Sequence, residues 1–159
     1  MNRILGIDPG YGRVGWGIIE GNRAEWKHLA HGCIKTDPKK SLAERLVQIE
    51  KELNTIIVQY KPTHAGVEEL YFAKNVTTGL KVAHARGVMV LALQKAKIPM
   101  KSVTPLQVKQ SVTGYGKADK KQVQHMVALI LGLKEKSFQD DAADALAVAL
   151  YIGAIARAY

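Results

Sequence analysis

The chain opens with a short apolar run that ends in an acid. The segment RILGIDPG, residues 3–10, carries Asp8 at the end of the apolar run, and Pro9-Gly10 breaks the run immediately afterwards. Such a run, bounded by proline and glycine, is typical of a buried strand followed by a sharp turn. The pattern therefore predicts a central strand with Asp8 at its carboxyl end.

Two more strands are predicted before the first helix. Residues 14–19 alternate apolar side chains with glycine, which favours a strand that lies close to a neighbour. Residues 24–36 supply another strand after a turn at Gly21-Asn22, and Asp37-Pro38 closes the segment. The short connections between the three strands predict an antiparallel meander.

Helical spacing begins after this meander. Ser41 and Glu44 have the spacing of a capping box, and apolar residues then recur at helical intervals as far as Tyr60. Lys61-Pro62 ends the helix. A second short apolar strand, HAGVEEL at 64–70, follows and ends in acids as the first one does.

The second half of the chain alternates helices with one further strand. In order, the pattern predicts a helix over 75–97, a strand over 100–103, a short helix from Thr104-Pro105 to about Val112, a helix between Asp119 and Gly132, and a last helix opened by Ser137. Strands separated by helices are parallel to one another. We therefore expect one domain over residues 1–159, of the α/β class, with a mixed five-stranded sheet and helices on both faces.

Composition and charge narrow the class of partner. The 159 residues are 47% apolar and 23% charged, which excludes disordered and fibrous proteins. The formal net charge is +9, and a basic excess of this size in a compact chain favours a polyanionic partner, most simply nucleic acid. A basic soluble protein without such a partner is the alternative that charge alone leaves open.

Cysteine content and the N-terminus indicate the compartment. Cys33 is the only cysteine, so the chain has neither a disulfide framework nor a thiolate metal cluster, which suits a reducing cytoplasm. The first predicted strand begins within three residues of Met1 and leaves no room for a signal segment. The longest uncharged apolar stretch, 145–156, is too short to span a bilayer. We expect a cytoplasmic protein with no membrane partner.

Acids recur in apolar surroundings at three places, which are Asp8, the pair Glu68-Glu69 and the start of the last helix. In that helix Asp141 and Asp144 project from one face, whereas Asp140 is turned away. If that face abuts the ends of the first and fourth strands, four carboxylates converge, and like charges this close need cations. Oxygen ligands favour Mg²⁺ or Mn²⁺, and a pair of such ions activates water for phosphodiester cleavage.

Each acid also has a structural explanation. Taken alone, Asp8 is explained by a turn in which its side chain accepts local backbone N–H bonds. Asp140 lies three residues after Ser137, and we interpret it as the acidic half of a capping pair. Strand alternation sends Glu68 and Glu69 to opposite faces, so one of them belongs to a site and the other to solvent. Spacing alone leaves the joint metal site and these explanations both open.

Seven segments spread over nearly the whole chain match a known pattern. They are ILGIDPG at 4–10, GCIKT at 32–36, VEELYFAKN at 67–75, ARGV at 85–88, QVKQ at 107–110, KKQVQHMV at 120–127 and DAADALAVA at 141–149. With these segments the chain resembles the RuvC family, the bacterial Holliday junction resolvases, whose fold is ribonuclease H-like. The resemblance implies the same fold here.

The resemblance implies a catalytic and metal-binding set of Asp8, Glu68, Asp141 and Asp144. This set selects Glu68 over the neighbouring glutamate and agrees with the helix-face interpretation of the two late aspartates. Some members of the family carry histidine at one of the helical positions, where this chain keeps aspartate. The implied cofactor is Mg²⁺, with Mn²⁺ as a substitute, at two ions per subunit when substrate is bound.

The resemblance also implies DNA contacts. Tyr71 matches an aromatic residue that stacks at the junction centre, where other members carry phenylalanine, and such stacking is worth about 1–3 kcal/mol per base. Lys109 and Lys120 match lysines that contact the phosphate backbone near the cut. Further candidates for the basic surface are Lys74, Arg86, Lys117 and Lys121. Without the resemblance, Tyr71 is also explained as a core residue and each lysine as a solvated charge.

As an activity, the resemblance implies a homodimer that binds a four-way DNA junction and nicks two strands of like polarity, leaving 5′-phosphate and 3′-hydroxyl ends. It also implies work with the branch-migration complex of RuvA and RuvB. The predicted helix over 75–97 is our candidate for the dimer interface. Two alternatives are a non-catalytic junction-binding module and a ribonuclease H-like nuclease for another branched or RNA-containing substrate.

Overall fold

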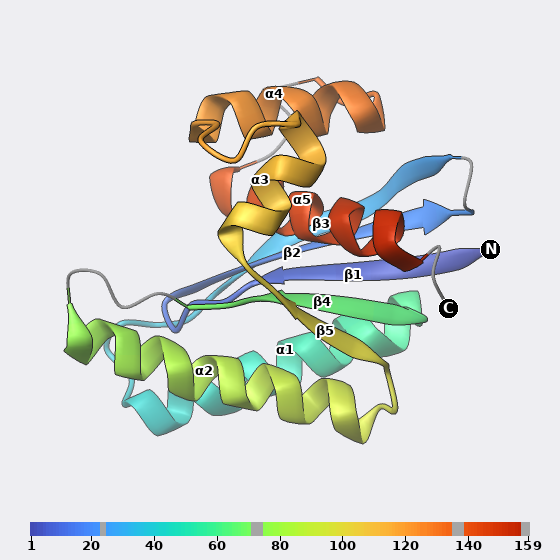
Figure 1. The fold of residues 1–159 in the computed structure, drawn as a ribbon. Helices are drawn as coiled ribbons and strands as arrows, with labels where there is room; N and C mark the ends of the chain where they lie inside the picture. Colours follow the sequence, from blue (N-terminus) through green and yellow to red (C-terminus); the bar gives the residue numbers. More distant parts are fainter. Residues whose placement is uncertain (23–24, 71–74, 135–138, 157–159) are drawn as a thin grey trace.

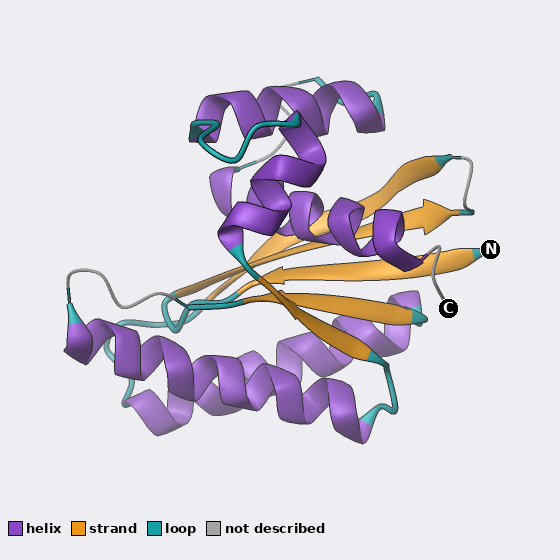
Figure 2. Cartoon of the chain, in the orientation of Figure 1, coloured by secondary structure: helices purple, strands orange, loops and turns teal. Residues whose placement is uncertain are grey.

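The fold is a five-stranded sheet between two layers of helices. A computed structural model describes residues 1–22, 25–70, 75–134 and 139–156. Its elements are β1 (Asn2–Asp8), β2 (Arg13–Gly21), β3 (Trp26–Lys35), α1 (Leu42–Tyr60), β4 (His64–Glu68), α2 (Val76–Lys95), β5 (Met100–Val103), α3 (Pro105–Thr113), α4 (Lys120–Leu131) and α5 (Asp140–Ile155). Figure 2 shows the strands together in one sheet, with helices on both sides of it.

The sheet has the strand order β3-β2-β1-β4-β5. The first three strands form the predicted antiparallel meander, while β4 lies parallel to both β1 and β5. Figure 1 shows α1 and α2 on one face of the sheet and α3, α4 and α5 on the other. The mixed five-stranded sheet with helices on both faces, expected from the sequence, is confirmed.

Side chains of β1 alternate between the two hydrophobic cores. Leu5 and Ile7 belong to the core under α1 and α2, whereas Ile4 belongs to the core under α5. Successive strand side chains point to opposite faces, so Gly6 and Asp8 share the α5 face with Ile4. The apolar pattern of the first strand thus directs its terminal acid toward α5.

A row of glycines lets α5 lie against the backbone of the sheet. Gly17, Gly6 and Gly66 are register partners across β2, β1 and β4. A methyl group at Gly6 would overlap the carbonyl oxygen of Ala145 and would lie 2.6 Å from the backbone nitrogen of Ala149. At Gly17 and Gly66 a methyl group would lie 2.7 Å and 2.5 Å from side-chain carbons of Leu146 and Ile152, so α5 packs closely against all three strands.

The predicted capping box of α1 is present, and α4 has a capping box as well. At α1 the Ser41 hydroxyl accepts from the Glu44 N–H at 3.2 Å, and a Glu44 carboxylate oxygen accepts from the Ser41 N–H at 2.9 Å. At α4 Asp119 exchanges the same pair of bonds with Gln122. Gly132 ends α4 with a positive φ of 64°, as its position in the sequence predicted.

The prediction that Asp140 forms a capping pair with Ser137 at the start of α5 is wrong. Ser137 lies outside the described residues, and the N-cap of α5 is Gln139, which makes no side-chain cap hydrogen bond. Because the helix begins at Asp140, that side chain projects toward α4 and accepts a hydrogen bond from Gln124 Nε2 at 2.9 Å. Asp140 therefore connects two helices, although its place in the first turn still favours the helix dipole.

Candidate active site

Two neighbouring parallel strands end in acids at the same edge of the sheet. Ile7 of β1 is the register partner of Val67 of β4, so the next residues, Asp8 and Glu68, lie side by side at the carboxyl ends. Both are two residues beyond a glycine of the row beneath α5, and both therefore face α5. Their carboxyl groups interact through a side-chain hydrogen bond.

The first turns of α5 bring Asp141 and Asp144 to the same edge. The negative charges of Glu68, Asp144 and Asp141 all act on the carboxyl group of Asp8. The backbone of Asp141 lies against Gly15, the register partner of Asp8 on β2. The structure thus brings all four acids of the predicted catalytic set to one edge of the sheet, and we call these four side chains the acidic cluster.

Three acids of the cluster, Asp8, Glu68 and Asp144, have raised pKa values. Burial, followed by the charges of Glu68 and Asp144, raises the pKa of Asp8 from its ordinary value of 3.8 to about 8. Burial is also the largest cause that raises the pKa values of Glu68 and Asp144. The hydrogen bond raises the pKa of Asp8 and opposes the rise at Glu68, so Asp8 is the donor and Glu68 the acceptor.

Lysines border the cluster on the side of α3 and α4. Lys120 Nζ lies 3.3 Å from Asp144 Oδ2, and the charges of Lys109 and Lys120 both oppose the rise in the pKa of Glu68. Partial burial lowers the pKa of Lys120, but the charges of the aspartates around it raise the pKa above its ordinary value. Glu68, Lys109, Lys120 and Asp144 line a recess of about 190 Å³ with apolar walls.

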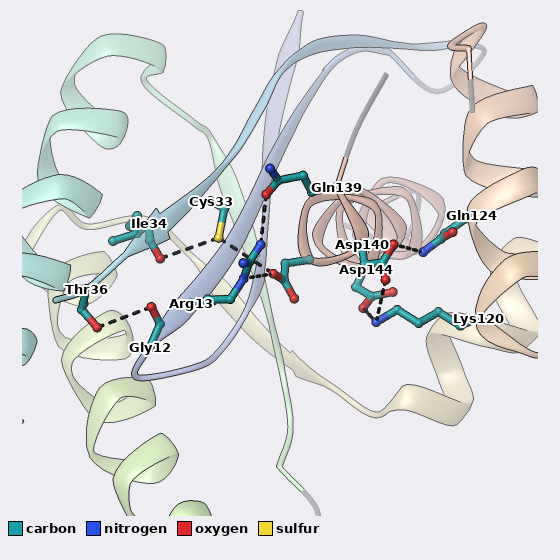
Figure 3. Close-up of polar contacts among 11 residues, drawn as sticks. Gly12, Arg13, Cys33, Ile34, Thr36, Lys120, Gln124, Gln139, Asp140 and Asp144 are labelled. Atoms are coloured by element: carbon teal, nitrogen blue, oxygen red, sulfur yellow. Dashed lines mark hydrogen bonds and ion pairs between the residues drawn. The ribbon is translucent and has the colours of Figure 1, made fainter. Parts of the chain in front are cut away.

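Arg13 borders the cluster on the opposite side, a contact that no pattern in the sequence predicted. The Arg13 Nε donates to Asp141 Oδ2 at 2.7 Å, and the Arg13 Nη2 donates to Gln139 Oε1 at 3.0 Å. The Cys33 thiol lies 3.9 Å from the same Asp141 oxygen. Figure 3 shows Arg13, Cys33 and Gln139 on one side of the α5 terminus and Lys120, Asp144 and Gln124 on the other.

The other residues that the sequence suggested for DNA binding do not border the acidic cluster in the described part of the chain. Tyr71 and Lys74 lie outside the described residues. Lys117 and Lys121 are exposed near the start of α4, and neither of them lines the recess. Arg86 on α2 donates to the Glu68 carbonyl oxygen at 3.1 Å and to the Ser102 hydroxyl at 2.6 Å, so it fixes the end of β4 against β5.

The donor set suits a hard divalent cation, but the acids are not gathered around one ion position. Among the described residues, no three His, Cys, Asp or Glu side chains are placed to hold one metal ion. Asp141 is turned to Arg13 and Asp144 to Lys120, while Asp8 and Glu68 share a proton. Oxygen ligands in this number match Mg²⁺ or Mn²⁺, and a cation between Asp8 and Glu68 would take the place of that proton. The residues therefore fit the metal that the sequence predicted.

The raised pKa of Asp8 makes stability depend on pH in a defined direction. The neutral carboxyl stabilises the metal-free fold fully below pH about 4, and this contribution is lost as the pH rises through about 8. Asparagine at position 8 is neutral at every pH. We expect the Asp8→Asn variant to match the wild-type protein near pH 4 and to exceed its free energy of unfolding by about 2–4 kcal/mol above pH 8, after allowance for solvent screening.

Urea unfolding of both proteins in EDTA, at intervals between pH 4 and pH 9, measures this difference. A difference between the two proteins that is the same at pH 4 and at pH 9 would show that folding does not raise the pKa of Asp8. Added Mg²⁺ is expected to remove most of the difference at high pH, because the cation replaces the proton of the wild-type site.

Comparison with known proteins places this geometry in a family. The family model for crossover junction endodeoxyribonuclease RuvC matches residues 4–151. The RuvC of Petrotoga mobilis is 46% identical over 156 residues, which cover 98% of this chain and 96% of that protein. The RuvC of Heliobacterium modesticaldum is 50% identical over 147 residues, which cover 92% of this chain and 91% of that protein.

Solved structures agree with the family match. A structure of Thermus thermophilus RuvC in complex with a Holliday junction substrate superposes with a TM-score of 0.92 at 34% identity, covering 99% of this chain and 96% of that one. The yeast mitochondrial Holliday junction resolvase Ydc2 shares the fold, with a TM-score of 0.65 at 18% identity. The ribonuclease H-like α/β fold expected from the sequence is confirmed.

Proposed function

Since this chain belongs to the RuvC family of crossover junction endodeoxyribonucleases, we propose that it resolves four-way DNA junctions by metal-dependent cleavage of the phosphodiester backbone. The observation that carries the proposal is the acidic cluster at the carboxyl edge of β1 and β4, bordered by basic side chains. Carboxylates alone repel phosphate, so a site that only bound DNA would gain nothing from four of them. The Thermus thermophilus structure with junction DNA supports this choice of substrate.

In the proposed mechanism, Asp8, Glu68, Asp141 and Asp144 would hold two Mg²⁺ ions when substrate is bound. Ions held there would supply activation of a water molecule and charge neutralisation at the leaving oxygen. Loss of the proton between Asp8 and Glu68 makes both carboxylates available as ligands. Lys120 and Lys109, which border the recess beside Glu68, bind the phosphate backbone, and the cut leaves 5′-phosphate and 3′-hydroxyl ends.

An exposed apolar stripe along α2 supports the proposed homodimer. Val76, Leu80 and Leu91 are 67%, 54% and 50% exposed, and together with His84 and Gly87 they recur at helical spacing on one side of α2. By length and composition α2 is also apolar enough to cross a membrane, but its other side packs against α1 and β5. A two-fold partner would cover the stripe and would bring two active sites to a two-fold substrate.

Introducing a charge into the stripe is expected to separate the subunits. In the Leu91→Glu variant the dimer dissociation constant should rise by about 100-fold or more, because an unpaired buried carboxylate costs several kcal/mol. Sedimentation velocity over a range of protein concentrations measures the change. Leu129→Glu is the matched control, since Leu129 is 66% exposed on α4. An unchanged dimer in Leu91→Glu would place the interface elsewhere.

The cellular setting completes the proposal. The family works with the branch-migration complex of RuvA and RuvB, and we extend that partnership to this chain. A nuclease of chromosomal junctions acts in the cytoplasm of a bacterium, and we place the protein there.

Incubation of the purified protein with an end-labelled synthetic four-way junction and Mg²⁺ tests the function. We expect paired, symmetric nicks in two strands of like polarity, little cutting of a linear duplex of the same sequence, and no cutting in EDTA. Junction binding without nicking would identify a binding module instead. Equal cutting of the linear duplex or of an RNA-containing duplex would favour a ribonuclease H-like nuclease of another specificity.

A further inference from the structure

We propose that Arg13 belongs to the cleavage site, where it positions Asp141 through Nε and binds a DNA phosphate through its remaining N–H groups. This inference rests on the proposed nuclease function and adds a residue that the family resemblance did not supply. It makes Arg13 the counterpart of Lys120, on the opposite side of the acidic cluster.

The contacts of Arg13 fix the orientation of the Asp141 carboxylate. The 2.7 Å bond from Arg13 Nε and the 3.9 Å contact of the Cys33 thiol both involve Asp141 Oδ2. Strand alternation puts Arg13 and Gly15 on the same face of β2, and the Asp141 backbone lies against Gly15. Asp141 is thus held at its backbone by the sheet and at one carboxylate oxygen by Arg13.

The same guanidinium has donors to spare. An arginine side chain carries five N–H groups in a planar fork. The bonds to Asp141 and Gln139 use two of them, and Cys33 interacts with the same guanidinium. The Arg13 side chain is 51% exposed, compared with 27% for the Asp141 side chain. The guanidinium group is therefore more accessible to solvent than the carboxylate to which it is bonded. Planar forks of this kind bind phosphate through two parallel hydrogen bonds.

The position of Arg13 beside the acidic cluster makes its remaining N–H groups available to a DNA phosphate. Figure 3 shows Arg13 and Lys120 on opposite sides of the α5 terminus, with the late aspartates between them. A DNA strand whose phosphate lies over the cluster meets strong negative charge there and needs a cation on each side of the cut. Lys109 and Lys120 supply positive charge on the recess side, and Arg13 supplies it on the β2 side.

Stability alone does not explain the arrangement. Exposed ion pairs contribute little to folding. The chain also offers an internal comparison at the far end of β1, where Arg3 Nε lies 2.7 Å from Glu20 Oε1 and the Arg3 side chain is 37% exposed. Both pairs have the same length and join an arginine to a single carboxylate oxygen, but Arg3 has no acidic cluster beside it.

The test compares Arg13→Gln with Arg3→Gln in two assays. Cleavage of a four-way junction is measured under single-turnover conditions in Mg²⁺. Junction binding is measured in proteins that also carry Asp8→Asn, so that the DNA stays intact. The salt concentration is varied from about 50 to about 300 mM, a range over which phosphate contacts change affinity strongly.

We expect Arg13→Gln to cleave about 10-fold to 100-fold more slowly than the wild-type protein. The slope of log affinity against log salt concentration should become shallower by about one, which corresponds to the loss of one phosphate contact. Arg3→Gln should leave both quantities unchanged. Arg13→Lys should keep the salt slope but remain slow in cleavage, because one ammonium group cannot hold Asp141 and a phosphate together.

An unchanged cleavage rate or an unchanged salt slope in Arg13→Gln overturns the proposal, and equal losses in Arg3→Gln do the same by revealing a general effect of charge removal. If Arg13→Gln does not fold, judged by circular dichroism, the Arg13→Lys result decides, and cleavage at the wild-type rate overturns the proposal. A wild-type protein that cuts no junction contradicts the proposed function itself, which is a separate result.

Discussion

Replacing Asp8 with asparagine is expected to abolish junction cleavage while junction binding is retained. Asp8 lies at the centre of the acidic cluster, where the charges of three other acids act on it. Loss of a metal ligand there removes several kcal/mol of transition-state stabilisation, so cleavage should fall by about 1,000-fold or more. Binding should persist because the basic side chains at the border are untouched and asparagine, like the protonated carboxyl group of Asp8, carries no charge.

Single-turnover cleavage and gel-shift binding of the same junction preparation measure the two effects. Asp37→Asn is the matched control, since Asp37 is an exposed aspartate in the loop after β3 that accepts a bond from the Lys39 N–H. It should cut at the wild-type rate. Cutting by Asp8→Asn at a rate near that of the wild type would remove Asp8 from the metal site.

Adding one methyl group at Gly6 is expected to damage both the fold and the activity. A side chain at Gly6 meets the backbone of Ala145 and Ala149, which cannot rotate away as a flexible side chain does. Relief requires α5 to move off the sheet and to carry Asp141 and Asp144 away from Asp8. We expect Gly6→Ala to lose about 3 kcal/mol of unfolding free energy, at the upper end of overpacking costs, and to lose at least about 100-fold in cleavage.

Gly87→Ala gives the opposite expectation and serves as the control. Nothing lies within 4 Å of a methyl group at Gly87, which sits inside α2. Alanine is a better helix former than glycine, so the variant should gain about 0.5–1 kcal/mol. Chemical denaturation measures the free energy of unfolding of both variants. A Gly6→Ala protein as stable as the wild-type protein would mean that α5 tolerates displacement.

Local patterns in the sequence predicted the strand ends and the helix caps because both depend on neighbouring residues. Asp8 follows its apolar run directly, and Ser41 and Glu44 stand at a fixed spacing. The shared edge of the sheet then follows from the parallel pairing of helix-connected strands. Glu68 was selected over Glu69 by family resemblance, and the register of β4 with β1 places Glu68 beside Asp8.

The partners of the late acids escaped prediction because they depend on contacts between distant segments. Arg13 and Asp141 are 128 residues apart, and no local pattern connects them. Asp141 and Asp144 were expected to share a helix face, yet residues three apart still differ by about 60° around the axis. That angle lets Asp141 turn to Arg13 while Asp144 turns to Lys120.

The glycine row also limits how the enzyme can change shape. Packed elements slide past one another when the side chains between them adopt new rotamers. Between α5 and the strands at Gly6, Gly17 and Gly66 the separation is too small for a layer of large side chains on the sheet side. Sliding of α5 along the three central strands is therefore restricted, and we expect Asp141 and Asp144 to keep their positions relative to Asp8 and Glu68.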